Sequence, residues 1–452
     1  MDEVVSNFST NKEIVLYIKK LESHLDKVNT NFFGIDFWPV IRLQISFSLV
    51  QKNQTLNKPK KFSSKDISYS SFFYNSRVKK PRQLFVTHDN YLIEIEGQKY
   101  DRVMEKLIQD CDSPMILNLA NNSIYSSHSG KPYMNITIQL FFIKALSYLT
   151  ALLLRLVWSQ QLSKLVQLQT RYKISSKPIV DKLSMSIRIC YVWFLSKYIL
   201  LFFKKHCINA VYQGMYYDNF GLASGLASDI LEISNNCVQH GGQSKNNPAF
   251  GSWFFGSSRG SQFLPNNFLC WDEYSTKGIS AWSKETDKHN YEIIGYSWMD
   301  IWKNKLSKNF EPISFTNKDT SIILVTLQPS VELKDSFLYD FILTSESQYN
   351  WLIRLHPQQE SKEFIQVLEK QFQHQDNIYI KSSKEPLPHL LINSNFHVTF
   401  FSSSVYEAKY CNVKSIVVDN RGLDYFPDLI ENGDILLAND RNHLEKILNN
   451  FS

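Results

Sequence analysis

Short apolar runs alternate with stretches of helical periodicity along the chain, most regularly after residue 320. The runs that we expect to be strands there cover residues 321–326, 351–355, 378–380, 398–401, 415–418 and 435–437, with helical periodicity between them. Strands and helices that alternate at this spacing form parallel βαβ crossovers. Residues 320–450 are therefore predicted to fold as a doubly wound, Rossmann-like domain.

The same alternation, less regular, occupies residues 80–302. Strands are expected at residues 84–87, 115–117, 210–212, 236–239, 268–271 and 292–294, with helices at 100–110 and 221–233. This pattern predicts a second open sheet, so the expected fold class is α/β with two Rossmann-like lobes. A helical segment over residues 1–60, a Lys/Ser-rich linker at 58–80 and a polar hinge at 303–319 complete the expected organisation.

Two stretches inserted in the first lobe, within residues 136–203, are unusually apolar and are expected to be helices at 136–158 and 187–203. A membrane-spanning helix needs about 20 consecutive, mostly apolar residues. Lys144 and Arg155 interrupt the first stretch, and the second is short. Three interpretations stay open: helices buried in the domain, aromatic helices with basic flanks on a membrane surface, and true spans.

Length, charge and cysteine content exclude several classes of protein. A chain of 452 residues suits two hydrophobic cores, and 43% hydrophobic with 20% charged residues is a globular composition. The net charge of +6 is compatible with anionic substrates or lipid, and is too small for a nucleic-acid-binding signature. Six cysteines without disulfide or zinc spacing, and a start without a signal pattern, indicate a cytoplasmic protein.

A turn of three serines, Ser402, Ser403 and Ser404, is the main binding candidate of the second lobe. It joins an expected strand to an expected helix, where hydroxyls and free N–H groups can hold a phosphate. The alternative is helix capping alone, which stabilises by about 1 kcal/mol. Glu407 in that helix is either a partner for ribose hydroxyls or a solvated residue, and Ser382 is a further donor-site candidate at a strand end.

A histidine followed by a proline ends the strand expected at residues 351–355. Arg354 and His356 are two residues apart and therefore point to the same face of that strand. Together they are suited to hold a diphosphate, the arginine through its bidentate fork. Pro357 keeps His356 out of helical geometry, and a plain turn histidine is the alternative.

Candidate catalytic residues of the first lobe also follow expected strands. His240, next to glycines that let a ligand approach the backbone, offers an imidazole general base. Asp218 and Asp89 are competing carboxylate bases. We expect four further residues to face the acceptor between the lobes: Gln239, Gly241, Tyr217 and Glu273. For Glu273 the alternative is a simple acidic turn.

Several catalytic signatures are absent from the sequence. It has no GxxxxGK[ST] loop, no GxGxxG opening a helix, no HExxH and no GxSxG that joins an expected strand to an expected helix. NTPase, dinucleotide oxidoreductase, zinc protease and hydrolase functions therefore lose their usual support. No D-x-D motif follows a strand in the way that a metal-dependent sugar-nucleotide site requires, so we expect no obligatory metal.

These motifs resemble those of bacterial cell-surface polysaccharide glycosyltransferases with two Rossmann-like lobes, the GT-B architecture. The resemblance covers roughly residues 80 to 440 and rests on the segments 216–221, 238–241, 268–273, 354–357 and 402–404. His-Pro followed about 45 residues later by Ser-Ser resembles the donor site of sialyl-, polysialyl- and Kdo-transferases. The resemblance implies that His356 and the serine turn contact the phosphate and nucleotide of a CMP-linked sugar, a co-substrate rather than a cofactor.

Two departures from that family keep other functions open. The acidic Asp/Glu-Asp/Glu-Gly triplet of the polysialyltransferases is absent, so the resemblance does not assign the base. Residues 239–241 also resemble teichoic-acid-type glycerophosphotransferases, which use CDP-glycerol, and a non-catalytic membrane-associated assembly factor is a third reading.

The reaction expected from the first reading is transfer across the cleft between the lobes. The second lobe holds the donor phosphate, a base of the first lobe deprotonates the acceptor hydroxyl, and closure excludes water. The expected partners are a nucleotide-sugar donor, a saccharide or lipid-linked acceptor and, peripherally, the inner membrane, but no nucleic acid.

Overall fold

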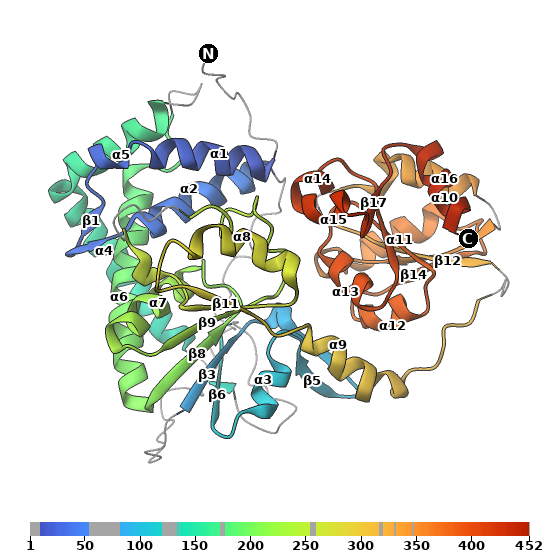
Figure 1. Ribbon diagram of the computed structural model, residues 1–452, viewed down its shortest axis with the longest axis horizontal. Coiled ribbons are helices and arrows are strands. Elements are labelled where there is room, and N and C mark those ends of the chain that lie inside the picture. The colour runs from blue at the N-terminus through green and yellow to red at the C-terminus, as the bar shows by residue number, and fades with distance from the viewer. Residues whose placement is uncertain are drawn as a thin grey trace. The chain divides into compact units, whose positions relative to one another are not determined.

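The chain forms two compact units, Met1–Gly295 (unit 1) and Tyr296–Ser452 (unit 2) (Figure 1). The structure is a computed structural model that describes residues 10–53, 82–119, 133–134, 136–171, 177–253, 259–315, 320–329, 331–345 and 348–451. The linker expected at 58–80 lies outside these ranges. Each unit contains one parallel sheet, as the alternating pattern predicted.

The sheet of unit 1 has seven parallel strands in the order β11-β10-β9-β8-β3-β6-β7. Numbered along the chain, the strands run 3-2-1-4-5-6-7 across the sheet, which is the doubly wound arrangement. The order reverses between β3 and β8, so the loops after these two strands flank the switch point. The strands are β3 (Arg82–Thr87), β6 (Pro114–Asn118), β7 (Tyr133–Met134), β8 (Ile208–Gln213), β9 (Ser234–Val238), β10 (Asn267–Cys270) and β11 (Asn290–Ile293).

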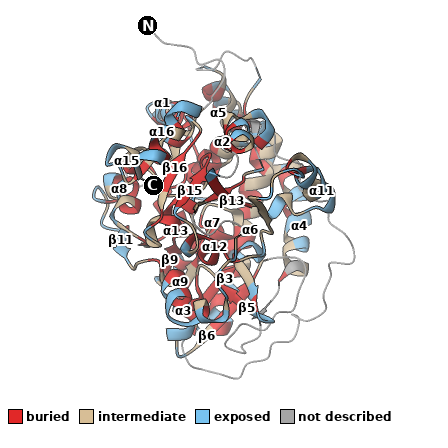
Figure 2. Cartoon of the chain, turned by 90° about the vertical axis from the view of Figure 1, so that its right-hand side faces the viewer, coloured by how far each residue is buried: buried red, intermediate tan, exposed pale blue. Residues whose placement is uncertain are grey.

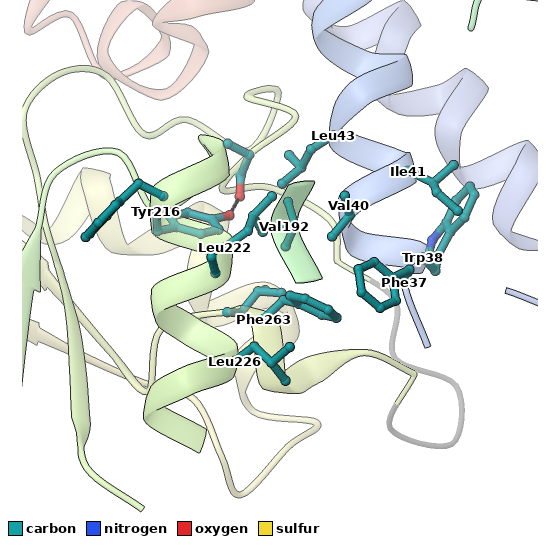
Figure 3. Packing of buried hydrophobic residues seen from close by; sticks show 14 of the residues in the cluster. Phe37, Trp38, Val40, Ile41, Leu43, Val192, Tyr216, Leu222, Leu226 and Phe263 are labelled. Atoms are coloured by element: carbon teal, nitrogen blue, oxygen red, sulfur yellow. Dashed lines mark hydrogen bonds between the residues drawn. The ribbon is translucent and has the colours of Figure 1, made fainter. Parts of the chain in front are cut away.

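The N-terminal helices belong to unit 1 rather than to a segment of their own. Helix α2 packs its apolar side chains into the main core beside α7 and the loop around Phe263 (Figure 3). The rings of Phe37 and Phe263 lie 5.0 Å apart, and Trp38 and Val40 are fully buried. The helices of unit 1 are α1 (Asn11–Glu22), α2 (Trp38–Asn53), α3 (Glu105–Asp110), α4 (Thr137–Val157), α5 (Ser159–Arg171), α6 (Lys182–His206), α7 (Asn219–Leu231) and α8 (Glu273–Ser283).

The prediction of one helix in the first lobe is partly wrong. Residues 100–110 were expected to be helical throughout, but Tyr100 lies in β5 (Gln98–Asp101), which pairs with β4 (Leu92–Ile95). Glu96 and Gly97 both have positive φ, 52° and 75°, and this geometry makes a tight hairpin turn. The hairpin shortens the helix to α3.

The two apolar helices of the insertion differ in their burial. Helix α6 packs on α7 and on β8, and α4 packs on the outer side of α6. Both are long and apolar enough, by length and composition, to cross a membrane. Of the apolar window of α6, 44% is buried, but of that of α4 only 11%, so the interpretation of a buried domain helix is wrong for α4.

The sheet of unit 2 has six parallel strands in the order β14-β13-β12-β15-β16-β17. Along the chain this order is 3-2-1-4-5-6, and it reverses between β12 and β15. The central strands of this sheet are largely buried (Figure 2). The strands are β12 (Ser321–Thr326), β13 (Tyr349–Arg354), β14 (Ile378–Lys381), β15 (Phe396–Thr399), β16 (Lys414–Val417) and β17 (Ile435–Leu437).

The helices of unit 2 begin before its first strand. Helix α9 (Ser297–Ile301) and the π-helical turn after it belong to this unit, so the division falls at 295/296 rather than near residue 302. The hydroxyl of Tyr296 donates to Glu407 Oε1 at 3.0 Å, which ties α9 to α13. The other helices are α10 (Phe337–Thr344), α11 (Lys362–Gln371), α12 (Leu387–Ile392), α13 (Ser404–Tyr410), α14 (Gly422–Tyr425), α15 (Pro427–Glu431) and α16 (Arg441–Phe451).

Candidate active site

Gln328 connects the two turns of unit 2 that the sequence singled out. It follows β12, at the switch point of the sheet. Its Oε1 accepts from the N–H of Phe401, just before the serine turn, at 2.8 Å, and its carbonyl oxygen accepts from Gln359 Nε2 at 3.3 Å. Gln359 in turn accepts from the N–H of His356. The His-Pro turn after β13 and the serine turn after β15 are thus held on either side of one residue.

The tautomer of His356 is set by its own turn. The N–H of Gln358 donates to His356 Nδ1 at 3.2 Å, so the neutral ring carries its proton on Nε2. Burial, with the neighbouring charge of Arg354, lowers the pKa of His356. A half-buried, neutral histidine with an Nε2–H donor is suited to bind a phosphate oxygen without needing to be protonated.

The three serines divide into one exposed residue, one that shapes the turn, and one that is buried. Ser402 Oγ accepts from the N–H of Ser404 at 3.3 Å, so this hydroxyl supports the turn. Ser403 is exposed and its side chain does not cap α13. Within the described residues no group accepts from the Ser403 N–H. This donor and the Ser403 hydroxyl are the groups that the turn leaves for a ligand.

Ser404 belongs to a buried polar network behind the turn. Its Oγ lies 3.0 Å from Thr326 Oγ1 and 3.2 Å from His397 Nε2, and His397 Nδ1 lies 2.9 Å from Ser415 Oγ. Burial lowers the pKa of His397 to about 3, so its ring is neutral. The network fixes the end of β15 and the start of α13, and Ser404 is therefore a structural residue rather than a ligand of the donor.

Two expected donor-site residues, Arg354 and Ser382, form hydrogen bonds with other residues of unit 2. Arg354 donates through Nε to the carbonyl of Glu385 at 3.2 Å and through Nη2 to that of Ser383 at 2.6 Å, so its fork holds the loop before α12. Ser382 donates to Glu360, which also accepts from the N–H of Ser383. The guanidinium of Arg354, which was expected to hold a diphosphate, thus donates to carbonyl oxygens of its own unit.

Glu407 and Pro357 keep the positions that the sequence assigned to them. Glu407 is buried in α13 and accepts from Tyr296, so it is not a solvated helix residue. Pro357 stands at the first position of the short turn that follows His356. The part of unit 2 that faces the switch point is thus His356, Ser403 and the frame around Gln328.

In unit 1 the switch point brings His88 and Asp218 together. His88 follows β3 and Asp218 follows β8, and His88 Nε2 lies 3.9 Å from Asp218 Oδ2. Asp218 also caps α7, since its Oδ1 accepts from the N–H of Gly221 at 2.6 Å. Burial raises the pKa of Asp218 to about 6, although Gly221 and the Arg188 charge oppose it. Burial lowers the pKa of His88 to about 4.

His240 joins this group from the neighbouring strand end. Its Nε2 lies 3.1 Å from the hydroxyl of Tyr217, and its ring is 5.5 Å from that of Tyr91. Burial and the nearby His88 lower the pKa of His240 to about 4. At neutral pH the group therefore has two neutral imidazoles and a carboxylate whose pKa is close to the ambient pH.

Several buried polar atoms beside these residues lack partners among the described residues, and two of them bear on the site. They are the hydroxyl of Tyr91 and Nε of Arg188. The Tyr91 ring fits because position 214 is glycine, where a Cβ would come within 2.5 Å of its hydroxyl. Arg188 donates through Nη2 to the carbonyl of Tyr217 at 3.4 Å. Unsatisfied buried groups at a strand-order reversal are typical of a binding site.

The other expected residues of unit 1 lie outside this group or serve as its frame. Asp89 is exposed and accepts from Asn118 at 3.1 Å. The amide of Gln239 is fully engaged, to the carbonyl of Gly241, to Ser275 and from the N–H of Trp271, so it is not free for an acceptor. Glu273 is exposed at the start of α8.

Sequence reasoning missed His88, Tyr91 and Arg188. His88 stands at the end of a predicted strand, as Asp89 does, so the strand-end rule applied to it. What the rule lacked was the strand order, which makes the end of β3 a neighbour of the end of β8. Over the described ranges, no three His, Cys, Asp or Glu side chains gather in a way that could hold a metal ion.

Comparisons with known proteins give similarity in fold only. No protein-family model matches the chain, and no curated protein matches it. Among solved structures it is similar to UDP-GlcNAc 2-epimerase from Neisseria meningitidis bound to UDP-GlcNAc, at 14% identity and a TM-score of 0.48, over 81% of this chain and 90% of that one.

Two further structures show the same degree of likeness. One is the Methanocaldococcus jannaschii UDP-GlcNAc 2-epimerase, at 13% identity and a TM-score of 0.46 over 82% of this chain and 92% of that one. The other is the calicheamicin glycosyltransferase CalG4, at 8% identity and a TM-score of 0.45 over 81% and 88%. At these values the likeness bears on neither substrate nor reaction.

Proposed function

We propose that the protein is a glycosyltransferase that uses a nucleotide-linked sugar, with its donor bound by unit 2. The observation that carries the proposal is the Gln328 frame, which presents the Nε2–H of His356 and the free N–H of Ser403 beside the β12/β15 reversal. Ligands of doubly wound sheets bind at the carboxyl ends of the strands at this reversal. Neutral donors placed there are suited to phosphate oxygens.

The donors of unit 2 act on the leaving group. When the bond between the anomeric carbon and the donor phosphate breaks, its electron pair goes to the phosphate oxygen. Hydrogen bonds from His356 and Ser403 stabilise the charge that develops there. Because Gln328 and the buried network behind Ser404 already fix both turns, little reorganisation is needed at the moment of reaction.

In unit 1, Asp218 is the group best suited to act as the general base. As the acceptor oxygen forms its bond to the anomeric carbon, its proton passes to the Asp218 carboxylate. A carboxylate whose pKa is raised to about 6 is still ionised at neutral pH and is a stronger base than an exposed one. His88, whose Nε2 lies 3.9 Å from Asp218 Oδ2, is neutral beside this carboxylate.

A cytidine nucleotide is the donor that we propose to test first, because His-Pro and Ser-Ser resemble the donor site of CMP-sugar transferases. The sugars considered are Kdo, sialic acid and other nonulosonic acids, and the acceptor is a surface saccharide, free or lipid-linked. A thermal-shift panel of CMP-, CDP-, UDP- and GDP-linked compounds tests this directly, because a ligand that prefers the native state raises the melting temperature. We expect the cytidine compounds to give the largest shift.

The variant His356→Ala tests whether a thermal shift in this panel arises from binding at the proposed donor site. It should lose most of the nucleotide-dependent shift while its own melting temperature stays close to that of the wild type. His356 is half-buried, and its hydrogen bonds among the described residues lie within its own turn. A panel in which no nucleotide shifts the wild type contradicts the proposal. So does an unchanged shift in His356→Ala.

A polyol-phosphate transferase remains the second candidate because its donor is also a cytidine nucleotide. The two reactions break different bonds: a glycosyltransferase releases CMP or CDP from the anomeric carbon, and a phosphotransferase moves the phosphate with the polyol. The mass of the product distinguishes them.

A further inference from the structure

Helix α4 exposes a continuous apolar face. Leu153, Leu156 and Val157 are 70%, 71% and 76% exposed, and Phe142 and Leu149 are exposed by more than half. These residues lie on one side of the helix, because they are spaced at three, four and seven positions. Exposed apolar area of this extent on one helix marks an interaction surface.

The opposite face of α4 is fixed to the rest of unit 1. Leu140 and Ile143 pack against the main core, and Ser147 and Ala151 are fully buried against it. Helix α6, on which α4 packs, ends at His206, and the sheet strand β8 begins at Ile208. A spanning α4 would pull this strand and the core into the bilayer, so α4 can meet a membrane only lying along its surface.

The Lys, Arg, Asp and Glu residues of the inserted helices are all basic. Helices α4, α5 and α6 together carry nine Lys or Arg residues and no Asp or Glu. On α4, Lys144, Tyr148 and Arg155 share one edge of the apolar face, because they are separated by four and seven positions. A tyrosine and two cations along the border of an apolar stripe form the pattern of a helix in the interface of a bilayer, with the apolar side down and the cations at the headgroups.

We infer that unit 1 docks through α4 on a bilayer that contains anionic lipid, with the helix parallel to the membrane plane. The inference does not depend on the proposed reaction. A second copy of the chain is a poorer occupant, because a symmetric contact through this face would bring Lys144 and Arg155 of one copy near those of the other. Anionic headgroups supply the opposite charge, and the acyl boundary accepts the leucines.

Flotation with two kinds of vesicle tests the inference, one of phosphatidylcholine alone and one of phosphatidylcholine mixed with phosphatidylglycerol. We expect the full chain to bind the mixed vesicles, and to bind the neutral ones and the mixed ones in high salt much more weakly, because screening removes the electrostatic part.

Substitutions on the exposed face separate its apolar and basic contributions. Leu149→Asp/Leu153→Asp should reduce binding about tenfold or more, since each leucine loses its burial in the acyl boundary. Lys144→Glu/Arg155→Glu should reduce binding to the mixed vesicles about fivefold or more for each cation and leave binding to neutral vesicles nearly unchanged. Val367→Asp on α11, where the valine is 56% exposed, is the matched control and should bind like the wild type.

Three results would overturn the inference. They are no binding of the wild type to the mixed vesicles, equal binding of wild type and Leu149→Asp/Leu153→Asp, or equal loss in Val367→Asp. Analytical ultracentrifugation covers the remaining occupant: a wild-type dimer that the leucine variant converts to a monomer, without vesicle binding, would assign the face to a second copy. Melting temperatures close to that of the wild type show that the variants are folded.

Discussion

The two units share one topology but use their switch points differently. In unit 1 the reversal between β3 and β8 gathers titratable side chains whose pKa values are displaced, and a tyrosine hydroxyl and an arginine Nε beside them lack partners among the described residues. In unit 2 the reversal between β12 and β15 is lined by polar groups that bond to one another through Gln328 and His397. One site keeps reactive groups available, and the other holds two turns rigidly for binding.

This difference shows why strand order alone does not assign chemistry. The same rule about strand ends selects a candidate site in both units. The two sites differ in whether their polar atoms already have hydrogen-bond partners. This decides whether a group is suited to act as a base or belongs to a rigid binding frame. The proposed transfer needs both a base and a binding frame, and each can be removed separately.

The largest effect is expected from removing the base of unit 1. Asp218→Asn should lower kcat about 10²–10⁴-fold, the range for a general base, with nucleotide binding unchanged. Asparagine still caps α7, so the melting temperature should stay close to that of the wild type. The measurement is transfer from the nucleotide compound that gives the largest thermal shift.

Asp272→Asn is the matched control for that variant. Asp272 also caps a helix after a strand of the same sheet, by accepting from the N–H of Ser275 at 2.9 Å, but it lies outside the group around His88. The activity of the Asp272→Asn variant should equal that of the wild type. If both variants lose activity alike, the loss is a matter of capping, and Asp218 is not the base.

The next effect concerns the binding frame of unit 2. His356→Ala should weaken donor binding about 10- to 100-fold, because it removes one hydrogen bond to a charged group worth about 1.5–3 kcal/mol. Isothermal titration with the stabilising nucleotide measures this. His374→Ala, at an exposed histidine of the same unit, should bind normally. Normal binding by His356→Ala would remove His356 from the site.

The pH dependence of the reaction should report Asp218 of unit 1. Because the pKa of Asp218 is raised to about 6, kcat/KM should be level above that pH and fall about tenfold for each unit below it as the carboxylate takes up a proton. The His88 and His240 rings, with pKa values lowered to about 4, stay neutral through this range. A rate that is level from pH 7 down to pH 5 contradicts this assignment.

The smallest effect is expected at the residue that joins the two turns of unit 2. Gln328→Met leaves the N–H of Phe401 without its acceptor, which should cost about 1 kcal/mol of stability and weaken nucleotide binding about three- to tenfold. Gln373→Met, at an exposed position, is the control. A variant that loses stability but binds normally would show that Gln328 holds the fold and not the site.

The strands and most helices followed from local pattern, but several side-chain roles did not. Runs such as 321–326 and 351–355 are mostly apolar because parallel strands are covered on both faces, and this signal is local. The strand expected at 398–401 lies at 396–399 instead. The hairpin at residues 92–101 was not predicted, because its turn depends on two positive φ angles at Glu96 and Gly97. Arg354 and Ser382 lie at the strand ends where they were predicted. They were expected to bind the donor, but they donate to carbonyl and carboxylate oxygens of their own unit.

The sequence by itself determined that the chain forms two parallel α/β sheets with polar residues at their strand ends, because burial and helical periodicity are read over a few neighbouring positions. Only the tertiary structure decided that His88 faces Asp218, that Gln328 joins the two turns of unit 2, and that α4 leaves one face uncovered. Each of these depends on which strands and helices become neighbours. That choice is made by packing between segments that are distant along the chain, so no local pattern of residues contains it.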